Sequence, residues 1–175
     1  VVNYIDWTPF FISWEMKGRY PDILTDPKYG KDAKQLLDDA YDMLLNIENN
    51  NWLKLKAVLG IWKVSKDGDD ILLFEKGKNI ETFNFLRQQL KTSKHNLCLA
   101  DYIGEGGDYM GAFVCTAGID IEKKLDEFVK DLDDYSSILL KSLADRLAEA
   151  LTEFMHEKVR KEIWGYAKIE NYTND

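Results

Sequence analysis

The sequence is poor in residue types that define whole classes of proteins. Only 3 prolines and 2 cysteines occur in 175 residues, so neither a proline-rich linker nor a disulfide framework fits the chain. No apolar run approaches the roughly 18 to 20 residues that a membrane-spanning helix needs, and the first residues do not resemble a secretory signal. We therefore expect a cytoplasmic protein with no membrane partner.

Positive charge is scarce as well. The chain has 23 Lys and Arg against 31 Asp and Glu, a formal net charge of -8. A surface with this balance repels the phosphate backbone of DNA or RNA unless a basic patch overrides it, and the sequence shows no such patch. We expect no nucleic-acid partner.

Motifs of metal sites and of several enzyme classes are missing. His95 and His156 lie far apart, and Cys98 and Cys115 form no Cys-x-x-Cys pair, so we expect no metal site and two buried, reduced thiols. The glycine-rich stretch Gly104–Gly107 lacks Gly-x-Gly-x-x-Gly spacing and precedes a strand-like segment instead of a helix. No Ser or Cys lies in a nucleophile elbow, and we therefore assign no catalytic residue.

What is present suffices for one compact core. Hydrophobic residues make up 45% and aromatic residues 13% of the chain, with no internal repeat and no low-complexity segment. Six aromatic residues fall within the first twenty positions, which predicts that this segment packs against the rest of the protein. We expect a single domain over residues 1–175.

The order of apolar patterns predicts an α+β fold. Helical spacing covers residues 32–47, 121–132 and 135–164, with Asn49–Asn51 ending the first helix and Asp133 or Asp134 capping the last. Strand-like segments cover residues 57–64, 71–74, 80–85, 97–103 and 109–116, with Asp67 and Gly68 in a hairpin turn. Because the strands follow one another without alternating helices, we expect about five strands in a mostly antiparallel sheet covered by helices.

One face of the long C-terminal helix is polar. Residues spaced by three and four place six side chains there: Ser142, Asp145, Glu149, Thr152, His156 and Arg160. Asp145 and Glu149 are like charges at i and i+4, an arrangement that favours a cation nearby. A stripe of this kind is also typical of a plain solvent-facing surface, and the pattern leaves both interpretations open.

Asp6 is a carboxylate among aromatic residues. It can cap the turn before Pro9 by accepting a backbone N–H. It can equally neutralise a positively charged ligand held against aromatic rings. The sequence does not choose between these two roles.

Six motifs resemble, in the same order, the activation domain of cobalamin-dependent methionine synthase. They are Tyr4–Phe11, Leu86–Gln89, Cys98–Tyr102, Asp108–Phe113, Ala144–Ala150 and Trp164–Ala167. The resemblance implies a C-shaped domain with a central twisted, mostly antiparallel sheet. It implies a module that binds S-adenosylmethionine and docks over a cobalamin-binding domain or corrinoid protein once the cofactor has oxidised to cob(II)alamin. An electron from flavodoxin or a similar reductant and a methyl group from S-adenosylmethionine then restore methylcobalamin. The module is thus implied to be part of a methyltransferase, and we expect no turnover from the module alone.

The resemblance also implies roles for three carboxylates. Asp6 matches the aspartate that accepts hydrogen bonds from the methionyl ammonium, Glu149 matches an acid near the S-adenosylmethionine site, and Asp145 matches a residue facing the cobalamin domain. The family continues after the Trp164–Ala167 motif into an Arg-x-Pro-x-x-Gly-Tyr-x-x-Cys-Pro segment that completes the pocket. We therefore expect a domain core truncated at both ends. The alternative is an adaptor or docking subunit for a corrinoid protein that has lost the S-adenosylmethionine pocket.

Overall fold

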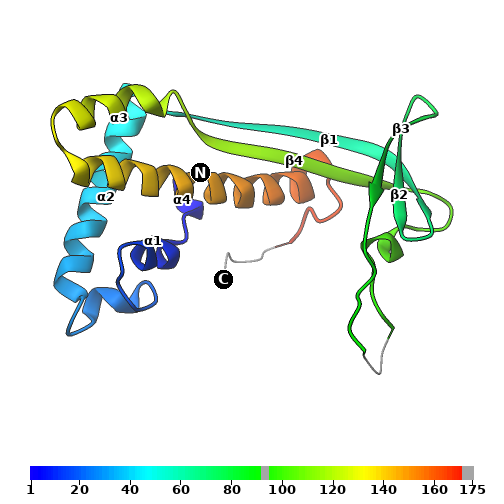
Figure 1. The fold of residues 1–175 in the computed structure, drawn as a ribbon, viewed down its shortest axis with the longest axis horizontal. Helices are drawn as coiled ribbons and strands as arrows, with labels where there is room; N and C mark the ends of the chain where they lie inside the picture. The colour runs from blue at the N-terminus through cyan, green and yellow to red at the C-terminus, as the bar shows by residue number, and fades with distance from the viewer. Residues whose placement is uncertain (92–94, 171–175) are drawn as a thin grey trace. The chain divides into compact units, whose positions relative to one another are not determined.

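The structure, a computed structural model, describes residues 1–91 and 95–170 (Figure 1). Its helical elements are η1 Val2–Tyr4, α1 Trp7–Ser13, η2 Asp22–Thr25, α2 Gly30–Asn50, η3 Leu99–Tyr102, α3 Ile121–Lys130, α4 Asp134–Lys158 and the π-helical turn η4 Val159–Ile163. Its strands are β1 Lys54–Asp67, β2 Asp70–Glu75, β3 Lys78–Asn84 and β4 Asp108–Ile119. The chain divides into two compact units: unit 1 comprises Val1–Ala57 and Cys115–Asp175, and unit 2 comprises Val58–Val114.

The strands form one sheet in the order β3-β2-β1-β4. β1 pairs antiparallel with β2 from Lys63 opposite Phe74 to Asp67 opposite Asp70, which confirms the predicted hairpin. Gly68 takes a φ of 60° in the turn, a conformation that glycine adopts at little steric cost. The fold is therefore α+β with a four-stranded antiparallel sheet and a long C-terminal helix, as predicted. The single domain stays a prediction.

The prediction of about five strands is wrong in one place. The segment around Leu97–Ile103 is not a strand, because it turns into the short helix η3. The Asp101 carboxylate accepts the backbone N–H of Cys98 at 2.9 Å, and this local bond favours a helical turn over an extended chain. The apolar pattern was misleading because three of its side chains, Cys98, Ala100 and Ile103, are indeed buried.

α2, α3 and α4 followed by η4 begin and end near the residues of the three predicted helices, whereas α1 was not predicted as a helix. Asn51 follows α2 in the left-handed conformation with φ 53°, which confirms the predicted stop. Asp133 caps α4 by accepting the backbone N–H of Ser136 at 2.9 Å, and this bond lowers the pKa of its carboxyl group. None of the helices in the two described ranges combines the length and apolarity needed to cross a membrane.

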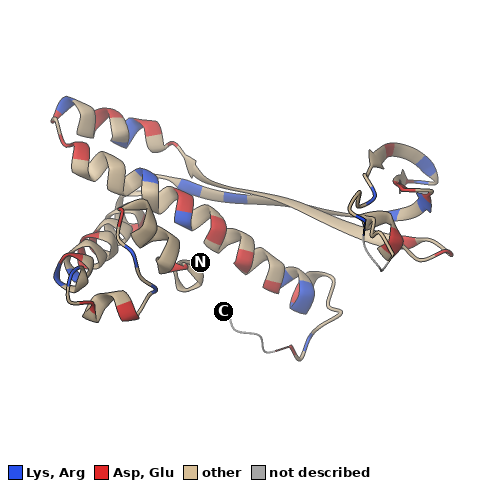
Figure 2. Cartoon of the chain, turned by 60° about the horizontal axis from the view of Figure 1, so that its bottom comes forward, with Lys and Arg blue, Asp and Glu red and all other residues tan. Residues whose placement is uncertain are grey.

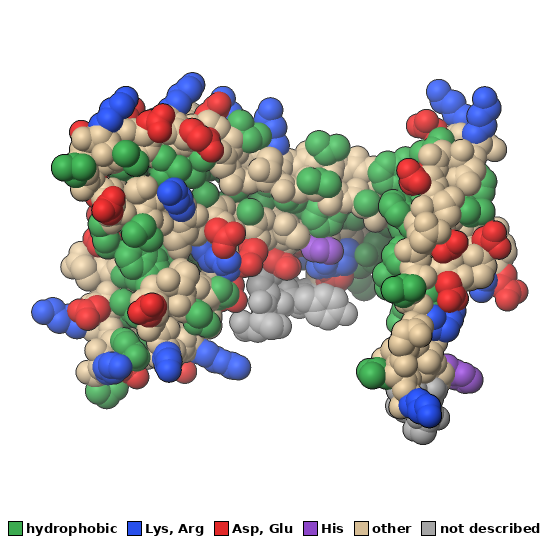
Figure 3. All heavy atoms as spheres, viewed as in Figure 1, with side chains coloured by type: hydrophobic (Ala, Val, Ile, Leu, Met, Phe, Trp, Pro, Cys, Tyr) green, Lys and Arg blue, Asp and Glu red, His purple; other side chains and the backbone are tan. Residues whose placement is uncertain are grey.

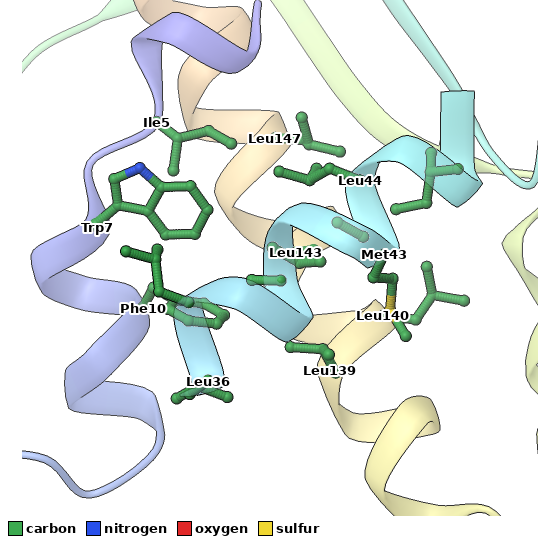
Figure 4. Packing of buried hydrophobic residues seen from close by; sticks show 14 of the residues in the cluster. Ile5, Trp7, Phe10, Leu36, Met43, Leu44, Leu139, Leu140, Leu143 and Leu147 are labelled. Carbon is green, nitrogen blue, oxygen red and sulfur yellow. The ribbon is translucent and has the colours of Figure 1, made fainter. Parts of the chain in front are cut away.

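The core of unit 1 lies where α1, α2 and α4 meet (Figure 4). The predicted aromatic packing is confirmed, since Trp7, Phe10 and Phe11 are all buried. Leucines of α2 and α4 fill the space between them, and Leu55 of β1 and Ala117 of β4 pack against the same cluster. These contacts fix the N-terminal segment against the long helix that carries the predicted site.

Unit 2 has a smaller core of its own, formed by Val64, Ile71, Leu73, Cys98, Ala100 and Ile103. Cys98 is buried and Cys115 of unit 1 is half-buried, and both are free thiols.

After β3 the chain runs out and back in two extended segments, which Figure 1 shows side by side in green. The backbone N–H of Gln88 donates to the carbonyl of Leu97 at 2.9 Å and joins them.

Arg87 holds these two segments together. Its guanidinium donates to both carboxylate oxygens of Asp101 at 2.7 and 2.8 Å, to Asp69 at 2.6 Å, and to the carbonyl of Asn96 at 2.7 Å. The bidentate pair with Asp101 joins the Leu86–Gln89 motif to the Cys98–Tyr102 motif. Both motifs therefore have a structural explanation within unit 2.

We expect Arg87→Met to loosen this connection. The substitution leaves the carboxylates of Asp69 and Asp101 without their cation, so the backbone amides of residues 85–91 and 95–103 should exchange with deuterium severalfold faster than in the wild type. Lys91→Met removes an exposed cation from the same segment and should leave the exchange unchanged. Equal exchange rates in the two variants would show that Arg87 does not stabilise this region.

The effect of Arg87 depends on pH in a defined direction. The bond from Arg87, followed by the N–H of Cys98, holds the pKa of Asp101 well below its usual range. Because the pKa is lower in the folded than in the unfolded state, the bond stabilises unit 2 above the usual pKa of aspartate, about 4, and this contribution is lost as the pH falls further. The difference in the stability of unit 2 between the wild type and Arg87→Met should therefore become smaller at acidic pH.

Candidate functional site

Asp6 lies at the surface, at the N-terminus of α1. The neighbouring aromatic side chains of Trp7, Phe10 and Phe11 are buried in the core, whereas the side chain of Asp6 is exposed. One carboxylate oxygen accepts the backbone N–H of Thr8 at 2.9 Å, so the predicted capping role is confirmed. A carboxylate offers roughly four acceptor positions, and the cap uses one. The carboxylate is therefore fixed in place and can still accept hydrogen bonds from a cationic ligand.

The segment that carries Asp6 packs along α4 at two points. The hydroxyl of Tyr4 donates to Glu157 at 2.6 Å, which raises the pKa of Tyr4, and its ring meets Phe154 edge to face at 5.7 Å. At the other end the hydroxyls of Ser13 and Ser142 lie 3.2 Å apart. Asp145 and Glu149 lie on α4 between these two points of contact. The N-terminal segment and the acidic part of α4 therefore belong to one surface of unit 1.

Asp145 and Glu149 are joined by Arg146. Its Nη2 donates to Asp145 Oδ2 at 2.7 Å and to Glu149 Oε1 at 3.2 Å, and its Nη1 donates to Glu149 Oε2. The cation that the like charges favour is thus supplied by the same helix. Sequence reasoning overlooked Arg146, although its position three residues before Glu149 is a usual spacing for an ion pair. Figure 2 shows acidic residues in red along the ribbon of α4, and Figure 3 shows acidic side chains on the surface of the same helix.

The side chains of the predicted polar stripe have different hydrogen-bond partners. The hydroxyl of Thr152 donates back to the carbonyl of Ala148 at 2.9 Å, a bond within the helix. Arg160 donates to Glu170 at 2.5 Å, which raises the pKa of Arg160 and fastens the segment after η4. Within the predicted stripe, the acidic side chains of Asp145 and Glu149 remain largely exposed, at 74% and 60%, while both pair with Arg146.

The structure brings the three candidate carboxylates into one unit without joining them all. Among the described residues, no hydrogen bond connects Asp6 with Asp145 or Glu149. A hollow of about 620 Å³ in unit 1 is lined by Val1, Val2, Leu147 and residues of α2 and β1, and its lining includes none of the three. Within the described ranges no group of three or more His, Cys, Asp or Glu side chains is arranged to hold a metal ion.

A solved structure shares this fold. The chain superposes with a TM-score of 0.94 and 43% sequence identity on the crystal structure of the MetH reactivation domain bound to AdoHcy. The match covers 99% of this chain and 56% of the solved one, so the chain spans little more than half the length of that relative. That relative binds S-adenosylhomocysteine.

The sequence itself identifies the family. The family profile described as "Vitamin B12 dependent methionine synthase, activation domain" matches residues 1–175. The chain belongs to this family, and the resemblance based on the six motifs is confirmed. The roles of Asp6, Asp145 and Glu149 stay predictions.

Proposed function

We propose that this chain is the S-adenosylmethionine-binding reactivation module of a cobalamin-dependent methionine synthase. The observation that carries the proposal is the solved relative, which matches almost the whole chain at 43% identity and holds S-adenosylhomocysteine, the demethylated form of the methyl donor. The module itself needs no catalytic residue. Its task is to hold the methyl donor against the cobalamin of a partner domain, which turns a rare encounter into an effectively intramolecular one.

The described residues fit this task. The carboxylate of Asp6 is exposed, fixed by its bond to Thr8, and free to accept further hydrogen bonds, as a site for the methionyl ammonium requires. In the proposal Glu149 lies near the ligand and Asp145 faces the cobalamin-binding domain. S-adenosylmethionine supplies the methyl group, and a reductant such as flavodoxin supplies the electron, when cob(II)alamin returns to methylcobalamin in the cytoplasm.

Calorimetric titration of the 175-residue chain with S-adenosylmethionine, and separately with S-adenosylhomocysteine, tests the proposal. We expect saturable binding in the micromolar to high micromolar range, because Asp6 and Glu149 supply the polar contacts of one part of the pocket. No heat up to millimolar ligand would contradict the proposal for this chain. That result would favour the docking subunit that meets a corrinoid protein and ignores S-adenosylmethionine.

A further inference from the structure

Arg146 differs from the two acids that it joins. Its side chain is 11% exposed, whereas those of Asp145 and Glu149 are 74% and 60% exposed. The arginine therefore lies beneath the two carboxylates and not beside them in solvent. A guanidinium is always charged and presents its donors in a rigid fork, so it holds each carboxylate in a defined direction.

The three charges set the electrostatic potential at this surface. Two carboxylates alone would present a charge of -2, and the guanidinium between them reduces the sum to -1. A cation approaching the exposed side of the carboxylates meets this reduced charge, since Arg146 is only a few ångströms behind them. Arg146 therefore both orients the two acids and limits how strongly they attract a cation.

We propose that Arg146 is a positioning residue that sets the preference of the site for S-adenosylmethionine over S-adenosylhomocysteine. The inference rests on the proposed function, in which Glu149 lies near the ligand. The two ligands share the ammonium, the carboxylate and the adenosine, and they differ in one methyl group and in the positive charge of the sulfonium. When the methyl group leaves, the bonding pair stays on sulfur, which becomes a neutral thioether. The ratio of the two dissociation constants therefore measures the potential near sulfur and is insensitive to the contacts that both ligands make.

Arg146→Met tests this role by removing the charge while keeping much of the apolar stem. We expect the ratio of the dissociation constant of S-adenosylhomocysteine to that of S-adenosylmethionine to rise about threefold to tenfold, the effect of one unit charge within roughly 10 Å at a partly solvated site. The increase should shrink at high salt, because salt screens exposed charges. Arg146→Lys keeps the charge and should keep the ratio within about twofold of the wild type.

Two further variants keep the test decisive. Arg160→Met removes the arginine of η4, the helical turn that follows α4, which is paired with Glu170, and should leave the ratio unchanged. Glu149→Gln removes a negative charge and should move the ratio in the opposite direction, so it tests the same idea even if Arg146→Met fails to fold.

The results separate the two proposals. If the wild type binds both ligands and Arg146→Met weakens both by the same factor, Arg146 has a structural role only and this inference is overturned while the proposed function stands. An unchanged ratio in a folded Glu149→Gln variant would overturn it as well. If the wild type binds neither ligand, both proposals fail.

Discussion

Asp6→Asn should weaken the binding of S-adenosylmethionine by roughly tenfold to a hundredfold while leaving the fold intact. The loss follows because hydrogen bonds to charged groups contribute about 1.5–3 kcal/mol, and the amide cannot match a carboxylate as partner of an ammonium. The fold should remain because asparagine is as good an N-cap as aspartate and can keep the bond to the N–H of Thr8. Calorimetry measures the binding, and urea denaturation measures the stability.

Asp133→Asn is the matched control for this prediction. Asp133 caps α4 in the same unit and accepts a backbone N–H at 2.9 Å, the same distance as in the cap made by Asp6. The control should therefore alter stability about as little and ligand affinity not at all. Equal affinity of Asp6→Asn and wild type would remove Asp6 from the site and leave it as a helix cap only.

Leu147→Ala should destabilise unit 1 by about 2–5 kcal/mol. Leu147 is 3% exposed and lies within the cluster between α1, α2 and α4, where Figure 4 shows it near Leu44. Truncation removes buried methyl groups and leaves a cavity that the surrounding helices fill only in part. The free energy of unfolding from urea denaturation is the measurement.

Asp145→Ala provides the comparison on the same helix. Asp145 is two residues away from Leu147 and its side chain is largely exposed. Its loss should cost no more than about 1 kcal/mol, because Arg146 keeps Glu149 as its partner. Similar losses in the two variants would mean that the buried and exposed faces of α4 are assigned wrongly.

Periodicity and capping residues allowed most of the fold to be predicted. The spacing of apolar residues in α2 and α4 is long and regular, and Asn51 and Asp133 mark helix ends for reasons that operate within a few residues. The segment around Cys98 was mispredicted because local hydrogen bonds form η3, among them the bond from the N–H of Cys98 to the Asp101 carboxylate. That carboxylate is itself held by Arg87, eleven residues before Cys98 and in a neighbouring segment. Such a contact has no signature in local sequence.

The site could be predicted only in part. The helical spacing placed Asp145 and Glu149 on one face, and the structure confirms that they meet through a cation. Their proximity to the segment of Asp6 depends on contacts between Tyr4 and Glu157 and between Ser13 and Ser142, which are more than 120 residues apart in the chain. The ligand roles came from the family resemblance and not from the physical pattern, because a capping aspartate and a ligand-binding aspartate look alike in a sequence.

A crystal structure of this chain grown with S-adenosylhomocysteine tests the central claim most directly. The account predicts electron density for the ligand on the surface of unit 1, with its ammonium within hydrogen-bonding distance of Asp6 and with Glu149 nearby. Density for the ligand at a site that excludes Asp6, in crystals where that surface is open to solvent, would contradict the account.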